Sequence, residues 1–121
     1  MSRVIFASHG GLSKGMKDSV SMIVGDLAKD VETYSLLPGQ NPEDFYQEVL
    51  KEAKESEEQI LILCDIKGGS VHTALSKLAV LDNVMVFSGM NMGLALDAVM
   101  KSLGGNLELA DANDLIKAAK E

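Results

Sequence analysis

Residues 4–11 read Val-Ile-Phe-Ala-Ser-His-Gly-Gly, and this stretch decides the fold that the sequence predicts. The apolar residues indicate a buried strand, the two glycines interrupt it, and a helical pattern begins near Leu12. His9 is therefore expected at the carboxyl end of a first strand, the edge of a sheet where α/β proteins bind ligands. This position makes His9 the first candidate for a functional side chain.

A second stretch, residues 60–70, has the same construction: an apolar run, an acid, a glycine turn and the start of a helix. The continuous apolar character of Ile60–Cys64 predicts a strand buried on both faces, as in a parallel sheet. Cys64 is expected to be a small buried hydrophobe rather than a reactive thiol. Asp65 follows this strand directly, and Ser70 is expected to cap the next helix.

Strands and helices alternate along the rest of the chain. We predict strands at residues 3–8, 31–37, 60–64 and 84–87, with helices over 12–27, from Pro42, after Ser70, after Asn91 and over 111–120. Asn41 and Asn91 are predicted N-caps, and Gly25 inside the first helix is expected to mark close packing against the sheet.

This alternation predicts an α/β fold: one domain over residues 1–121, built on a doubly wound, mostly parallel four-stranded sheet with helices on both faces. The simplest order of the strands is 2-1-3-4, which places the first and third strands side by side. The point where the winding reverses then falls between them, and ligands bind at such points. We therefore expect His9 and Asp65 to meet there.

Composition excludes several classes of protein. The 121 residues include 11 basic and 18 acidic side chains, a net charge of −7, which disfavours nucleic acid and anionic membranes as partners. The single cysteine excludes an intramolecular disulfide and fits a reducing compartment. The sequence also lacks a secretory h-region and an apolar span, so we expect a soluble, cytoplasmic protein.

A histidine in this position can act as a nucleophile, a metal ligand or a general base. A facing carboxylate would fix its tautomer, and free backbone N–H groups in the two glycine turns would hold a phosphate-like anion. The combination favours phosphoryl transfer through a phosphohistidine. The catalytic candidates are His9 and Asp65, and the phosphate-binding candidates are Gly10, Gly68, Gly69 and Ser70.

Other ligands have weaker signals. The turn after His9 lacks the Gly-Lys-Ser/Thr arrangement of a nucleotide P-loop, and no cofactor is expected. No short-range pair such as His-x-x-x-His occurs, so no metal site is predicted. His72, the only other histidine, is expected in solvent or on the rim of the crevice, and the seven methionines are expected to be mostly core filler.

Three motifs resemble the IIA component (EIIA) of the mannose-type phosphotransferase system (PTS): Ser8-His9-Gly10, Asp65-x-x-Gly68-Gly69-Ser70 and Gly89-x-Asn91. The similarity covers about the first 103 residues. It implies a phosphotransferase with the doubly wound fold, usually a homodimer. His9 would receive a phosphoryl group on its outer ring nitrogen from HPr and pass it to a histidine of EIIB. Asp65 would orient His9, and Ser70 would hydrogen-bond the phosphoryl group.

The same resemblance implies that the protein is connected to the membrane only indirectly, through the EIIC and EIID transporter. Val71 and Gly93 stand where the family often has proline, which concerns the choice of EIIB and not the chemistry. The alternatives are the phosphotransferase subunit of dihydroxyacetone kinase, whose motif more often reads His-Ser, and small tetrapyrrole chelatases, which usually follow His-Gly with Ser-Arg. A regulatory sensor on the same fold is a further alternative.

Two surfaces are predicted for partners. HPr and EIIB would share a rim formed by Leu12, Met16, Lys67, Val71, His72, Met90 and Met92, because both must reach His9. The tail offers a second surface for a homodimer, since it carries more apolar residues than a free tail should: Leu107, Leu109, Leu115 and Ile116.

Overall fold

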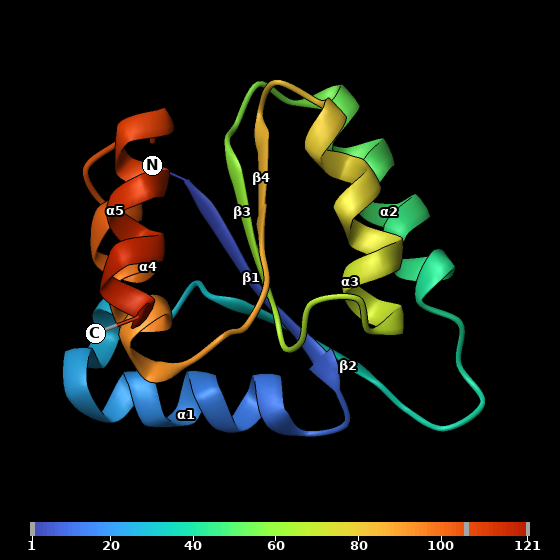
Figure 1. Ribbon diagram of the computed structural model, residues 1–121, viewed down its shortest axis with the longest axis horizontal. Helices are drawn as coiled ribbons and strands as arrows, with labels where there is room; N and C mark the ends of the chain where they lie inside the picture. The colour runs from blue at the N-terminus through green and yellow to red at the C-terminus, as the bar shows by residue number, and fades with distance from the viewer. Residues whose placement is uncertain (1, 106, 121) are drawn as a thin grey trace.

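The computed structural model describes residues 2–105 and 107–120 as one sheet covered by helices. The elements are β1 (Arg3–His9), α1 (Leu12–Val24), η1 (Gly25–Ala28), β2 (Glu32–Leu36), α2 (Pro42–Glu55), β3 (Ile60–Cys64), α3 (Ser70–Leu75), η2 (Ser76–Val80), β4 (Val84–Phe87), α4 (Met92–Ser102) and α5 (Leu109–Lys120), where η marks a 3-10 helix. The strands are all parallel and lie in the order β2-β1-β3-β4, as the sequence predicted. Figure 1 shows α1, α4 and α5 on one face and α2 and α3 on the other.

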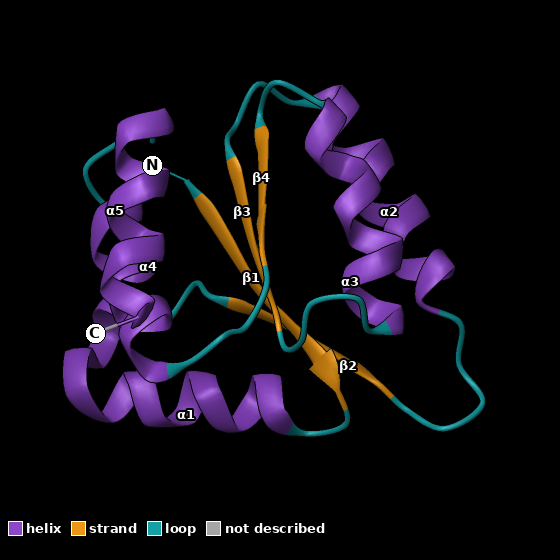
Figure 2. Ribbon diagram, viewed as in Figure 1, coloured by secondary structure: helices purple, strands orange, loops and turns teal. Residues whose placement is uncertain are grey.

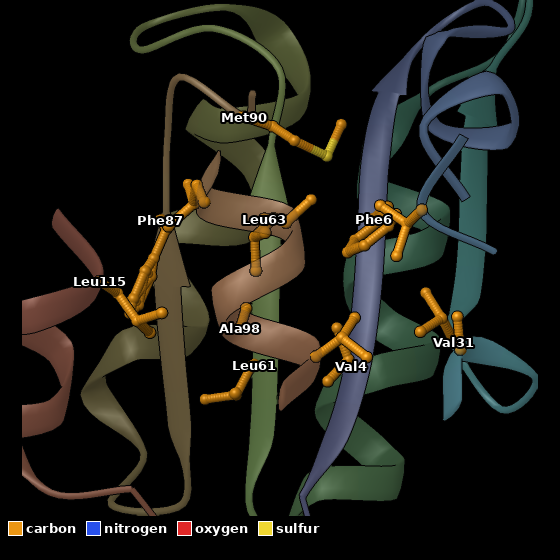
Figure 3. Packing of buried hydrophobic residues seen from close by; sticks show 14 of the residues in the cluster. Val4, Phe6, Val31, Leu61, Leu63, Phe87, Met90, Ala98 and Leu115 are labelled. Atoms are coloured by element: carbon orange, nitrogen blue, oxygen red, sulfur yellow. The ribbon is translucent and has the colours of Figure 1, made fainter. Parts of the chain in front are cut away.

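The core consists of two apolar clusters, one on each face of the sheet. Alternate residues of the central strands point to opposite faces: Val4 and Phe6 enter one cluster, whereas Ile5 and Ala7 enter the other. Figure 3 shows the first cluster, in which side chains of β1, β3 and β4 meet residues of α4 and α5. All five residues of β3 are buried, which confirms the prediction of a strand covered on both faces.

Asparagine side chains begin two of the helices as predicted. Asn41 Oδ1 accepts the backbone N–H of Glu43 at 3.0 Å, and Asn91 Oδ1 accepts that of Leu94 at 2.9 Å. The prediction for Gly25 was wrong: the glycine ends α1 instead of lying inside it. It has a φ of +60°, and a Cβ there would find no atom of the described residues within 4 Å. Gly25 is therefore needed for the left-handed turn and not for close packing.

The start of α3 also differs from the prediction. Gly69 occupies the N-cap position and Ser70 is the first helical residue, so Ser70 does not cap the helix. Its hydroxyl instead faces His9. The helix continues as the 3-10 segment η2, in which Ala79 is exposed.

The tail packs against its own chain. Helix α5 begins at Leu109, two residues before the predicted start, and lies along α4 (Figure 2). Leu107 and Leu115 are buried in the core, whereas Ile116 is exposed, and the side chain of Leu109 lies outside the described ones. Two of the leucines that suggested a dimer surface are thus accounted for within one chain, and the homodimer stays a prediction. Along residues 2–105 and 107–120, no helix is long and apolar enough to cross a bilayer.

Candidate functional site

The strand order brings His9 and Asp65 together at the carboxyl edge of the sheet. Strands β1 and β3 are adjacent, with Ala7 opposite Cys64. Asp65 Oδ2 accepts two hydrogen bonds from His9, one from the backbone N–H at 2.8 Å and one from ring Nδ1 at 2.8 Å. The second carboxylate oxygen, Oδ1, accepts the N–H of Ile66 at 2.9 Å. The predicted meeting of the two side chains is confirmed.

The carboxyl group of Asp65 is largely enclosed, since its side chain is 9% exposed against 46% for His9. Burial alone would raise the pKa of Asp65. The hydrogen bonds donated by His9 and Ile66 outweigh burial and hold the pKa below its ordinary value. Asp65 is therefore a carboxylate at neutral pH. A carboxylate can only accept, so the proton of neutral His9 resides on Nδ1 and the lone pair on Nε2.

The hydroxyl of Ser70 occupies the other side of the imidazole. Its Oγ lies 2.9 Å from His9 Nε2 and donates to the lone pair in the tautomer that Asp65 imposes. Ser70 and His9 are both exposed residues, so the hydroxyl and the ring lie at the surface of the molecule. The arrangement gives an oriented ring nitrogen with an available lone pair and a movable hydroxyl beside it.

The backbone groups expected to hold an anion are already bonded in this structure. The N–H of Gly10 donates to Leu36 O at 2.8 Å, because the ladder between β1 and β2 continues past the strand end. The N–H of Gly69 donates to Ile66 O at 3.2 Å, and that of Gly68 to His72 Nδ1 at 3.1 Å. The prediction of free amides at these three glycines was therefore wrong, because strand β2, helix α3 and the second turn itself already accept from them.

No structural role was predicted from the sequence for two buried serines near His9 in the chain, although Ser8 belongs to the first motif. Ser8 Oγ accepts the N–H of Ser13 at 2.7 Å and donates to Gly10 O at 3.2 Å. Ser13 Oγ donates to Tyr34 O at 2.9 Å on the neighbouring strand. Both serines are fully buried. The available signal was a polar residue, Ser8, at the end of an otherwise apolar strand, with Ser13 five residues later at the start of a helix.

Two residues of the predicted partner rim belong to the core instead. Val71 is 0% exposed and Met90 is 7% exposed, because α3 and the segment after β4 turn these side chains toward the sheet. Neither can contact a partner, so this part of the prediction was wrong. The remaining rim residues are exposed or partly exposed: Leu12, Met16, Lys67, His72 and Met92.

Cys64, which precedes Asp65, is inert by its surroundings. Its side chain is fully buried, and burial together with the charge of Asp65 raises the pKa of the thiol to about 12. This confirms the prediction of a small buried hydrophobe. Over the described part of the chain, no three or more His, Cys, Asp or Glu side chains gather in a way that could hold a metal ion.

Comparison with known proteins places the chain among phosphotransferase proteins. The family profile EIIA-man, described as the PTS system fructose IIA component, matches residues 3–115. The PTS system sorbose-specific EIIA component of Klebsiella pneumoniae is 33% identical over 101 residues, which are 82% of this chain and 73% of that protein. These matches do not favour the dihydroxyacetone kinase alternative.

Solved structures agree with this placement. A mannose/sorbose-specific IIA subunit from Enterococcus faecalis has a TM-score of 0.80 at 26% identity, covering 98% of this chain and 89% of that one. The phosphotransferase component EIIA from Streptococcus agalactiae has a TM-score of 0.85 at 23% identity, covering 99% and 93%, and shows the same fold. The protein therefore belongs to the mannose-type EIIA family of the sugar phosphotransferase system, the family that the three motifs resembled.

Proposed function

We propose that this chain is a phosphoryl carrier, which accepts a phosphoryl group from phospho-HPr on His9 and passes it to EIIB for sugar uptake. One observation carries the proposal: Asp65 holds Nδ1 of His9 at 2.8 Å, which leaves the lone pair on Nε2 of a ring that is 46% exposed. The ring is thus oriented and in the tautomer that a nucleophile needs.

The transfer balances without a further reactant. The Nε2 lone pair of His9 attacks the phosphorus, the bond from phosphorus to the donor nitrogen of HPr breaks, and a bond from Nε2 to phosphorus forms. Nδ1 keeps its proton, so the ring gains positive charge that the Asp65 carboxylate offsets across 2.8 Å. Ser70 turns its hydroxyl from Nε2 to a phosphoryl oxygen. Transfer to EIIB is the same step with the roles of donor and acceptor exchanged.

HPr and EIIB would use one surface in turn, because each must bring a histidine to the same atom. The predicted rim residues that are exposed or partly exposed are the candidates for this surface: Leu12, Met16, Lys67, His72 and Met92. Adding unphosphorylated EIIB to labelled EIIA already bound to HPr should displace HPr in NMR spectra. A ternary complex that keeps both sets of shifts would contradict the shared surface.

The central test is phosphorylation by phosphoenolpyruvate, enzyme I and HPr. We expect an acid-labile phosphate on the wild-type chain and none on His9→Ala. His72→Ala, the matched histidine control, should still become labelled at the end point. Undiminished labelling of His9→Ala would overturn the proposal.

A further inference from the structure

We infer that His72 is a positioning residue for phosphoryl transfer: its Nδ1 holds the backbone N–H of Gly68 and so fixes the loop that sets Ser70 against His9. The bond is 3.1 Å long and joins residues four apart, across the junction between the loop after β3 and helix α3. The inference rests on the proposed function, since it assigns a part in that reaction to a residue that makes no contact with the transferred group.

Gly68 is held on both sides of its peptide by the first turn of α3. Its N–H donates to His72, while its carbonyl accepts the hydroxyl of Thr73 at 3.3 Å. The next carbonyl, that of Gly69, accepts the N–H of Thr73 at 2.8 Å. Gly68 has a φ of +79°, a conformation that glycine adopts easily but does not prefer over others. These bonds therefore select one path for a chain that could take several.

The path of Gly69 shows why the position of Gly68 matters at the ring. A Cβ on Gly69 would lie 2.8 Å from Ile66 Cγ2 and 3.2 Å from His9 Cε1, so the backbone passes directly against the imidazole. Ser70 follows, with Oγ 2.9 Å from Nε2. If Gly68 moved, Gly69 would move with it. That would change the contact with the imidazole of His9 and the position of the Ser70 hydroxyl.

The two histidines of the chain then carry their protons on different nitrogens. His9 donates from Nδ1 to Asp65, whereas His72 must leave Nδ1 free as the acceptor for Gly68 and carry its proton on Nε2. Long-range proton–nitrogen NMR spectra of the imidazoles distinguish these tautomers. A proton on Nδ1 of His72 would overturn the inference directly, whatever the activity of the protein.

Three variants at position 72 separate the acceptor atom from the bulk of the ring. In Asn, the side-chain oxygen lies near the place of Nδ1, whereas in Gln it lies near that of Nε2, and Leu has no acceptor. We expect amide exchange of Gly68 to be roughly 2- to 10-fold faster in His72→Leu and His72→Gln, the effect of one neutral hydrogen bond, and near the wild-type rate in His72→Asn. Unchanged exchange in His72→Leu would overturn the inference.

The initial rate of phosphorylation by phospho-HPr should follow the same order. We expect a roughly 2- to 10-fold lower rate for His72→Leu and His72→Gln, with rescue by His72→Asn and the same end point for all. Faster Gly68 exchange with unaltered rates would overturn the positioning role. If the wild-type chain takes no phosphoryl group at all, the proposed function fails, while the tautomer and exchange measurements still decide whether His72 holds the loop.

Discussion

The glycine turns after β1 and β3 look alike in sequence, yet the structure holds them by different means. Both contain a left-handed glycine, with φ of +57° at Gly10 and +79° at Gly68. The first turn is anchored to the sheet at Gly10, whose N–H donates to the backbone of β2 and whose carbonyl accepts the hydroxyl of the fully buried Ser8. The second is held by bonds within its own segment, from the largely enclosed carboxylate of Asp65, the partly exposed His72 and the backbone carbonyl of Ile66. A shared pattern of residues thus gives a similar chain path without giving a shared source of rigidity.

This difference suits the two tasks that we propose for the turns. The first turn carries the reacting ring of His9 and is itself bonded to the sheet. The second turn brings the charge of Asp65 and the hydroxyl of Ser70 to that ring. Each of these side chains makes its own hydrogen bond to the imidazole, so one bond can change while the other stays. Substitutions in the second turn should therefore change the rate of transfer, whereas those in the first should change the stability of the fold.

The largest effect after loss of His9 itself is expected for Asp65→Asn. The amide keeps one oxygen, and in either orientation its NH₂ faces an N–H donor, that of Ile66 or those of His9. Hydrogen bonds to charged groups contribute about 1.5–3 kcal/mol, so the rate of phosphorylation should fall roughly 10- to 100-fold. The rate is measured as initial labelling from phospho-HPr.

Asp97→Asn is the matched control for that change. It removes the same charge from α4, where Asp97 pairs with Lys101 at 3.0 Å on the same helix. Labelling should proceed at the wild-type rate. Equal rates for Asp65→Asn and the wild type would show that the carboxylate does not orient the ring.

A smaller effect is expected for Gly69→Ala. The added methyl would lie 2.8 Å from Ile66 Cγ2 and 3.2 Å from His9 Cε1. Ile66 is 59% exposed and can move aside, so the remaining displacement falls on the imidazole. Because misplacement of a reacting group by 1 Å can cost about 100-fold, a shift of a few tenths should slow labelling roughly severalfold.

Gly10→Ala provides the contrast from the first turn. A Cβ there would meet none of the described atoms within 4 Å, but the residue would have to keep a φ of +57°. That conformation costs a residue with a side chain about 1–2 kcal/mol, which urea denaturation would report as a lower free energy of unfolding. If Gly69→Ala loses more stability than Gly10→Ala, the contrast between the two turns is incorrect.

The sequence predicted the sheet because its signals are local. The apolar run Ile60–Cys64 and the glycine breaks after each strand are visible without knowledge of tertiary contacts, and the order of strands followed from a topology rule. The pairing of His9 with Asp65 followed from that order. Asn41 and Asn91 were also recognisable as caps, since capping depends only on neighbouring residues.

What the sequence did not reveal depends on the direction in which a group points. Val71 and His72 are neighbours, but the turn of α3 buries the first and leaves the second partly exposed against Gly68. The amide of Gly10 is bonded to Leu36 O, a carbonyl that only the folded sheet brings near. Burial of Ser13 depends in the same way on Tyr34, which is 21 residues away along the chain.

The smallest effect concerns stability in acid. The folded-state pKa of Asp65 is lowered, although burial opposes this, because His9 and Ile66 donate hydrogen bonds to the carboxylate. The unfolded chain therefore binds a proton more readily at this group. The stabilisation of the fold by the Asp65 carboxylate is complete above the unfolded pKa of about 3.9. It is lost as the pH falls through the lower folded value. Urea midpoints of the wild type and Asp65→Asn should therefore converge as the pH drops below about 4. Parallel curves down to pH 3, with Asp97→Asn as the reference for loss of one carboxylate, would mean that the bonds from His9 do not favour the charged form. The orientation of the ring would then have to come from the anchored turn beneath it and not from the second turn.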